Sequence, residues 1–160
     1  MTAEQVVRPA GAGDAVWMLG GRYTVKVSGA DSDGQVTVME MAMPAGFGPP
    51  PHTHPGGESV YVLDGTARFN IGDEVVEAGP GSFLHIPAGT VENFEPTSDL
   101  RLLVAYTPGG IDKFFLELGD RAEGPGLPPT PQGPPSEEFM NRMVTVAARY
   151  GMDMKLPASH

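Results

Sequence analysis

Residues 46–65 read Gly-Phe-Gly-Pro-Pro-Pro-His-Thr-His-Pro-Gly-Gly-Glu-Ser-Val-Tyr-Val-Leu-Asp-Gly, and this stretch decides the fold and the candidate chemistry. His52 and His54 are two residues apart, so both rings point to one face of an extended strand. After the turn at residues 55–57, a returning strand could bring the carboxylate of Glu58 beside the two imidazoles. Two imidazoles and one carboxylate suit a divalent transition metal and leave positions open for substrate or oxygen.

The segments around this stretch alternate polar and apolar residues and are separated by turns rich in Gly, Pro and Asp. The expected strands are residues 21–28, 35–43, 58–63, 66–71, 74–78, 82–86, 91–94 and 100–106. Short strands with turns about every 8–12 residues and no helix between them predict an all-β barrel or a double-sheet jelly roll.

The amino-acid composition excludes several kinds of site and classes of partner. The 160 residues include no cysteine, which excludes disulfides, thiolate metal ligands and cysteine nucleophiles. The net charge is -10 and the basic residues are scattered, so nucleic acid and anionic membranes are not expected partners. The sequence shows no signal peptide and no apolar run of about 20 residues, so we expect a soluble cytoplasmic protein that acts on a small molecule.

The chain ends differ from the barrel region. We expect residues 1–19 to form an N-terminal arm that is loosely ordered over residues 1–13, residues 20–108 the barrel, and residues 109–160 a C-terminal extension. The extension should hold a short helix over residues 111–118, a Pro-rich linker over 121–135, and a final helix that Ser136 caps and Gly151 ends. The apolar stripe of the final helix predicts packing outside the barrel, against its wall or a second subunit.

The spacing around the histidines also resembles a family signature. Gly46, five residues, His52-x-His54, three residues, Glu58, six residues and Gly65 match the first motif of the cupin superfamily at every fixed position. A bare pair of histidines in a turn region would be more typical of solvated loop residues. The complete spacing favours a metal site, and the resemblance implies the cupin fold, a double-stranded β-helix or jelly-roll barrel.

The turn residues of the second cupin motif are present, but the position of its metal ligand is changed. Gly81 and the turn Pro87-Ala88-Gly89 fit the motif, but Glu92 stands where the family carries its fourth ligand, a histidine. Glu92 could coordinate, which would favour harder ions such as Mn or Fe(II). It could instead act as a general base beside a three-ligand metal, or point elsewhere.

Other residues complete the candidate site. From strand parity we expect apolar pocket walls from Met41, Phe47, Val60, Val62 and Phe94. His85 alternates with core residues, so we expect it to face away from the barrel, at the surface or a dimer contact. His160 ends the sequence and is expected to be a frayed tail rather than a ligand.

The C-terminal extension, from Gly109 to Gly119 and on to Tyr150-Gly151-Met152, resembles that of bacterial quercetin-dioxygenase-like cupins. That resemblance implies a homodimer and dioxygen chemistry on a flavonol or related enol, at one divalent ion (Fe, Mn, Ni or Co), with Glu58 accepting the substrate's proton. Three hypotheses remain: a metal-dependent dioxygenase, a non-oxidative isomerase, cyclase or decarboxylase in which Glu92 shuttles protons, and a small-molecule-binding barrel without turnover. Fold alone does not separate them.

Overall fold

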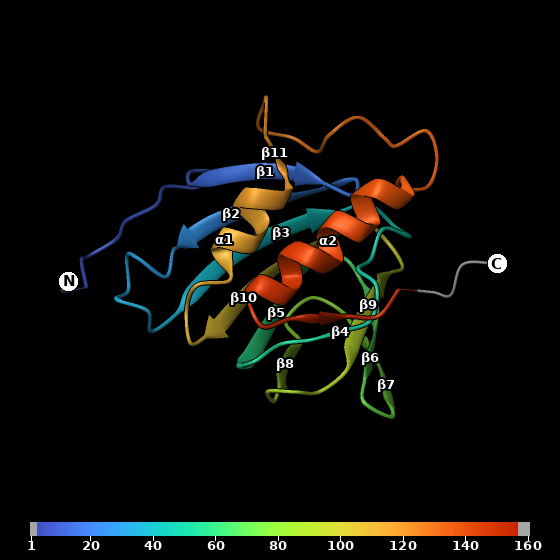
Figure 1. Ribbon diagram of the computed structural model, residues 1–160, viewed down its shortest axis with the longest axis horizontal. Coiled ribbons are helices and arrows are strands. Elements are labelled where there is room, and N and C mark those ends of the chain that lie inside the picture. Colours follow the sequence, from blue (N-terminus) through green and yellow to red (C-terminus); the bar gives the residue numbers. More distant parts are fainter. Residues whose placement is uncertain (1–2, 157–160) are drawn as a thin grey trace.

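The computed structural model describes residues 3–156, which form two antiparallel sheets and two helices (Figure 1). The elements are β1 (Asp14–Met18), β2 (Gly21–Val27), β3 (Thr37–Met43), β4 (His52–Thr53), β5 (Gly57–Asp64), β6 (Ala67–Ile71), β7 (Glu74–Ala78), β8 (Phe83–Ile86), β9 (Glu92–Pro96), β10 (Leu100–Thr107), α1 (Asp112–Leu118), β11 (Asp120–Arg121), α2 (Glu137–Arg149) and β12 (Asp153–Met154). The larger sheet has the order β11-β1-β2-β3-β10-β5-β8, and the smaller one β12-β4-β9-β6-β7. The predicted fold class, a mainly β jelly roll with a helical C-terminal extension, is confirmed.

The core lies between the sheets because the strands alternate buried and more exposed side chains. Along β3, Met39, Met41 and Met43 are almost fully buried, and the residues between them are not. Strand β10 repeats the pattern, with Leu102 and Val104 paired to Met41 and Met39 of β3. Burial of this continuous apolar face is the main stabilisation of the barrel.

Two glycines of the histidine motif are required by space. Gly65 adopts φ 82°, and a Cβ there would lie 1.9 Å from the carbonyl oxygen of Asp99. A Cβ on Gly56 would lie 2.1 Å from the carbonyl oxygen of Thr107. The turn before Glu58 therefore packs directly on the end of β10, which fixes where β5 begins.

The N-terminal prediction is wrong in part, because Asp14–Met18 is a strand rather than an arm. Strand β1 forms a hairpin with β2, with Val16 opposite Tyr23, and it also contacts α1. Val16 and Met18 are buried. The strand is short and follows a Gly/Ala-rich segment, so what stabilises it is pairing with β2 and cover from a helix distant in sequence.

The two helices also differ from the expectation of packing outside the barrel. They lie across one face of the larger sheet (Figure 1), and their side chains share a cavity with residues of both sheets. The ring of Phe115 on α1 stacks on Tyr23 of β2 at 5.2 Å between centroids. Met143, Val146 and Ala147 of α2 are buried, and the hydroxyl of Ser136 caps this helix by accepting from the backbone N–H of Phe139 at 3.1 Å. The helices therefore close one end of the space between the sheets.

Glu117 joins the two helices. Its side chain accepts a hydrogen bond from the Tyr150 hydroxyl at 2.8 Å and pairs with Arg149 at 2.6 Å, while its backbone carbonyl accepts from Arg142 at 3.0 Å.

Neither helix in residues 3–156 is long and apolar enough to cross a membrane.

Candidate metal centre

Four side chains from both sheets meet at one point between the sheets. In the smaller sheet His52 of β4 lies directly opposite Glu92 of β9, and His54 follows two residues later. In the larger sheet Glu58 of β5 lies between Tyr106 of β10 and Ile86 of β8. Because all four side chains point inward, the structure brings together the residues predicted from the two motifs, Glu92 included.

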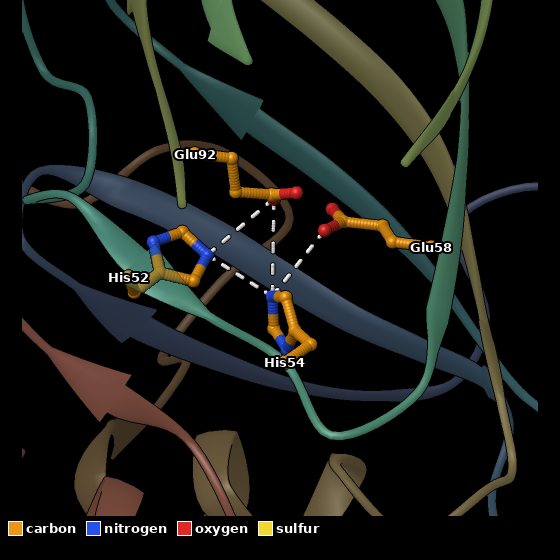
Figure 2. Close-up of side chains that lie close together, drawn as sticks. All are labelled: His52, His54, Glu58 and Glu92. Carbon is orange, nitrogen blue, oxygen red and sulfur yellow. Dashed lines mark hydrogen bonds and ion pairs between the residues drawn. The ribbon is translucent and has the colours of Figure 1, made fainter. Parts of the chain in front are cut away.

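The donor atoms of these residues converge (Figure 2). One ligand atom from each lies within 4.8 Å of every other, and all four residues are buried. The Nε2 atoms of His52 and His54 are 3.0 Å apart. Nε2 of His54 is 3.3 Å from Glu58 and 3.9 Å from Glu92, and Nε2 of His52 is 3.5 Å from Glu92. This clustering matches the compact donor set that a single metal ion requires.

Local contacts fix the orientation of the cluster. Nδ1 of His52 lies 2.9 Å from the carbonyl oxygen of Pro50, to which it can donate a proton, leaving the Nε2 lone pair directed at the cluster. The backbone N–H of Gly89 donates to the carbonyl oxygen of His54 at 2.9 Å. The turn of the second motif is thereby attached to the first motif, which sets the register at which β9 presents Glu92.

Burial and mutual contacts shift the pKa values of three of the four cluster residues, His54, Glu58 and Glu92. Burial, with the nearby His52, lowers the pKa of His54 to about 4, so its imidazole is neutral at pH 7. Burial raises the pKa of Glu58 well above the usual value, and the adjacent Glu92 carboxylate raises it further. Burial alone would also raise the pKa of Glu92, but its interactions with His52, Glu58 and His54 lower it. The two carboxylates are thus pushed apart in pKa.

Two buried oxygens provide the sharpest test of whether a metal fits. Oε2 of Glu58 and Oε2 of Glu92 are the buried side-chain polar atoms without a hydrogen-bond partner in the described part of the chain. A buried carboxylate oxygen without a hydrogen-bond partner is costly, and a divalent cation is the partner that two such oxygens beside two imidazoles would take. The residues present therefore fit one divalent ion.

A cavity of about 50 Å³ adjoins the cluster and shows which predicted wall residues line it. Met41 and Phe94 line this cavity, as do His52, His54 and Glu58. Val60 and Val62 are not among the lining residues but lie in the core, 2% and 0% exposed. Phe47 lies outside, because the loop around it packs against the turn at Gly20, where a Cβ would be 2.7 Å from the Phe47 ring.

Sequence reasoning missed the other half of the cavity. Its further lining residues are apolar or aromatic: Met18, Leu19, Tyr23, Pro49, Pro50, Val104, Tyr106, Phe114, Phe115, Met143, Met152 and Met154. The centroid of the Tyr106 ring lies 5.1 Å from that of the His54 ring. Burial raises the pKa of Tyr106 well above the usual value, and the nearby carboxylates of Glu58 and Glu92 raise it further. Parity along β10 could have identified Tyr106, since it alternates with the buried Val104. Tyr106 and His54 also border a second pocket of about 290 Å³, which Lys113 and Tyr150 line too.

The other two histidines are placed differently. His85 is exposed on the outer face of the larger sheet, where its Nδ1 lies 3.0 Å from the Ser59 hydroxyl. It faces away from the barrel, as strand parity predicts. His160 lies outside the described residues.

A family model described as "Cupin domain" matches residues 39–106, which hold all four cluster residues. Residues 39–106 form a cupin domain. Solved structures agree on the fold. An RmlC-like cupin from Shewanella frigidimarina superposes with a TM-score of 0.62 at 12% identity, over 70% of this chain and 98% of that one. Streptomyces Pac13, described as a unique nucleoside dehydratase, superposes with a TM-score of 0.56 at 16% identity, over 69% of this chain and 88% of that one.

A curated relative is more similar in sequence than these structures. Quercetin 2,3-dioxygenase of Bacillus subtilis (strain 168) is 30% identical to the chain over 128 residues, which are 79% of this chain and 38% of the relative. The chain therefore spans well under half the length of that enzyme.

Proposed function

We propose that this cupin is a metal-dependent dioxygenase, in which His52, His54, Glu58 and Glu92 hold one divalent transition metal and the substrate is a small aromatic or enolic compound. The observation that carries the proposal is the buried set of four donor residues, in which two carboxylate oxygens have no hydrogen-bond partner. The resemblance to quercetin 2,3-dioxygenase over most of the chain supports the reaction type.

The two glutamates have different surroundings and therefore different proposed roles. Glu58 lines the cavity in which a substrate group would lie, whereas Glu92 is not among the lining residues. We therefore assign proton acceptance from the substrate's enolic hydroxyl to Glu58, which is within reach of that cavity. Glu92 lies 3.5 Å from Nε2 of His52, and its lowered pKa keeps it ionised, so it contributes negative charge to the cluster. When bound, the ion would supply Lewis acidity for the resulting enolate oxygen.

Oxygen uptake tests the proposal directly. The protein is loaded with Fe, Mn, Ni or Co under nitrogen, mixed with a panel of flavonols and smaller enols, and exposed to dissolved oxygen in an electrode cell. We expect oxygen consumption that matches substrate loss mole for mole, and abolition of both in Glu58→Gln. Substrate loss that proceeds at the same rate without oxygen would contradict the dioxygenase proposal.

A specific observation supports a second candidate, a non-oxidative isomerase, cyclase or decarboxylase. The cluster carries a second carboxylate, Glu92, where the second cupin motif has histidine, and the two carboxylates differ in pKa. Paired carboxylates with separated pKa values are typical of acid–base catalysis. Conversion of substrate under nitrogen would favour this candidate over the first.

A further inference from the structure

The cavity at the metal centre is too small for a ring-bearing substrate. Its volume of about 50 Å³ leaves room for only a few atoms, since a single water needs about 10–15 Å³ of such space. A much larger pocket of about 980 Å³ lies beside it. We call this pocket the vestibule; its lining residues are Leu19, Gly46, Phe47, Gly48, Pro49, Pro50, Pro51, Pro131, Gly133, Pro134, Pro135, Ser136, Phe139, Met140, Lys155 and Leu156.

The vestibule and the metal cavity meet at a common boundary. Leu19, Pro49 and Pro50 line both spaces. Pro50 is also the residue whose carbonyl oxygen orients His52. Leu19, Pro49 and Pro50 therefore lie at the boundary between a molecule in the vestibule and the metal cavity.

Leu19 occupies a conformation that a leucine rarely adopts. It forms the turn between β1 and β2 with Gly20, and its φ is 51°. Such two-residue hairpin turns favour Gly, which has no Cβ to clash at positive φ, or Asn and Asp, whose side chains form local hydrogen bonds there. A leucine in this unfavourable conformation is better explained by a role of its side chain at the boundary between the two spaces.

The lining of the vestibule indicates the chemistry of its ligand. Proline rings, Phe47, Phe139, Met140 and Leu156 provide most of the surface. The two hydrogen-bonding side chains are already engaged: the Ser136 hydroxyl caps α2, and Lys155 pairs with Asp153 at 2.8 Å. A sugar or a nucleotide would bury many polar groups without partners here, whereas flat apolar rings match proline, phenylalanine and methionine surfaces.

We propose that the vestibule binds the uncharged aromatic ring system of the substrate, while the enolic end of the same molecule passes Leu19 to reach the metal centre. Leu19 is then a specificity-determining residue, because its side chain at the boundary slows the passage of ring-bearing enols more than that of short acyclic ones. This inference rests on the proposed function, because it assigns a second part of the same binding site.

Binding of two enols that differ in their rings tests the proposal. The probes are 3-hydroxyflavone, followed by its fluorescence, and acetylacetone, followed by calorimetry, each with metal-loaded protein. In Met140→Glu, a charge placed in the vestibule should weaken 3-hydroxyflavone binding by about tenfold or more and leave acetylacetone binding and metal content unchanged. Thr145→Glu, an exposed position on the same helix, is the matched control.

Two further variants keep the test decisive if α2 is perturbed. Phe47→Ala changes the opposite wall and should also weaken 3-hydroxyflavone binding selectively. Leu19→Gly suits the turn and removes the side chain, so 3-hydroxyflavone should associate at least about threefold faster. Unchanged affinity in Met140→Glu and Phe47→Ala, or an equal loss in Thr145→Glu, would overturn the inference. The flavone titration is repeated on protein stripped of metal, where Met140→Glu should still weaken binding. If the protein binds no metal but Met140→Glu weakens flavone binding, the proposed function is contradicted and the vestibule inference is not.

Discussion

Glu92 sets the charge of the candidate metal centre. It lies opposite His52 across the β4–β9 pair and gives the cluster two carboxylates and two imidazoles. A donor set with two carboxylates nearly neutralises a divalent ion and favours harder ions than an all-imidazole set would. The metal preference of the protein should therefore depend on this one side chain.

Substitution of Glu92 tests that dependence. Glu92→Gln should weaken Mn or Fe(II) binding by more than about 100-fold, since even residues that only support a ligand contribute roughly 10–100-fold. Glu92→His should restore binding and shift the preference towards Zn, Ni or Cu. Glu95→Gln, on the same strand but exposed, should leave the affinity unchanged, and competition titrations with a coloured chelator measure all three. Equal affinities in wild type and Glu92→Gln would show that Glu92 is no ligand.

His54 makes the metal-free protein sensitive to acid. Its pKa of about 4 in the fold lies below the ordinary 6.5, so between these pH values the unfolded chain takes up a proton that the folded chain refuses. The free energy of unfolding should therefore fall as the pH drops from about 6.5 to 4, by up to about 3 kcal/mol from this residue, at about 1.4 kcal/mol per pKa unit.

Glu58 acts in the opposite direction, so a variant is needed to isolate His54. The raised pKa of Glu58 means that the folded protein gains a proton first, and stability rises as the pH falls through that pKa. Urea unfolding across this pH range should show a steeper loss in metal-free wild type than in His54→Gln. Parallel curves for the two proteins would contradict the assignment of a neutral buried imidazole.

At the scale of elements, α1 should contribute stability through its inner face alone. Phe114 is 2% exposed and lines the cavity, whereas Leu116 on the same helix is 39% exposed. Phe114→Ala should lower the free energy of unfolding by about 3–5 kcal/mol, because it removes a buried ring and leaves a void. Leu116→Ala should cost well under 1 kcal/mol, as roughly expected for a surface substitution. Chemical denaturation measures both, and a comparable loss for the two would mean that α1 does not pack as described.

The sequence could predict the elements whose signals are local. Alternation gave the main strands, and the spacing of His52, His54 and Glu58 gave the cluster, because both depend on neighbours along the chain. Strand parity placed Val60 on the same side as Glu58 but could not tell that it lies deeper in the core. Phe47 follows a glycine in a loop, where alternation sets no direction.

Features made by distant parts of the chain could not be read from the sequence. The stripe on α2 shows that the helix is buried but not against which surface. Its contact with α1 and the shared cavity depends on the fold bringing Met143 beside Phe114, about 30 residues away along the chain. The same holds for β1, whose burial depends on α1.

At the scale of the whole molecule, an exposed apolar row lies on the outer face of the larger sheet. Leu103, Tyr61 and Phe83 are neighbours across β10, β5 and β8 and are 37%, 42% and 65% exposed. The apolar stripe of the final helix is buried within the chain, so this outer face is where we expect the predicted homodimer to form. Contiguous exposed apolar side chains on a sheet are typical of subunit contacts.

Phe83→Glu tests the dimer prediction. In an isologous contact the glutamate of one subunit would face the same glutamate of the other, and the two negative charges would repel each other. The variant should therefore be monomeric at micromolar concentration while the wild type is dimeric. Val75→Glu, an equally exposed position on the smaller sheet, should remain dimeric. Light scattering coupled to size exclusion measures the masses, and a monomeric wild type would refute the prediction.

The metal content of the protein tests the central claim most directly. Elemental analysis of protein purified without chelators should find one divalent transition metal per chain in wild type and in His85→Ala, whose histidine lies outside the barrel. The double variant His52→Ala/His54→Ala should remain folded by circular dichroism and contain almost none. Wild-type metal content retained in the double variant, or no transition metal in wild type even after incubation with Fe, Mn, Ni or Co, would contradict the account.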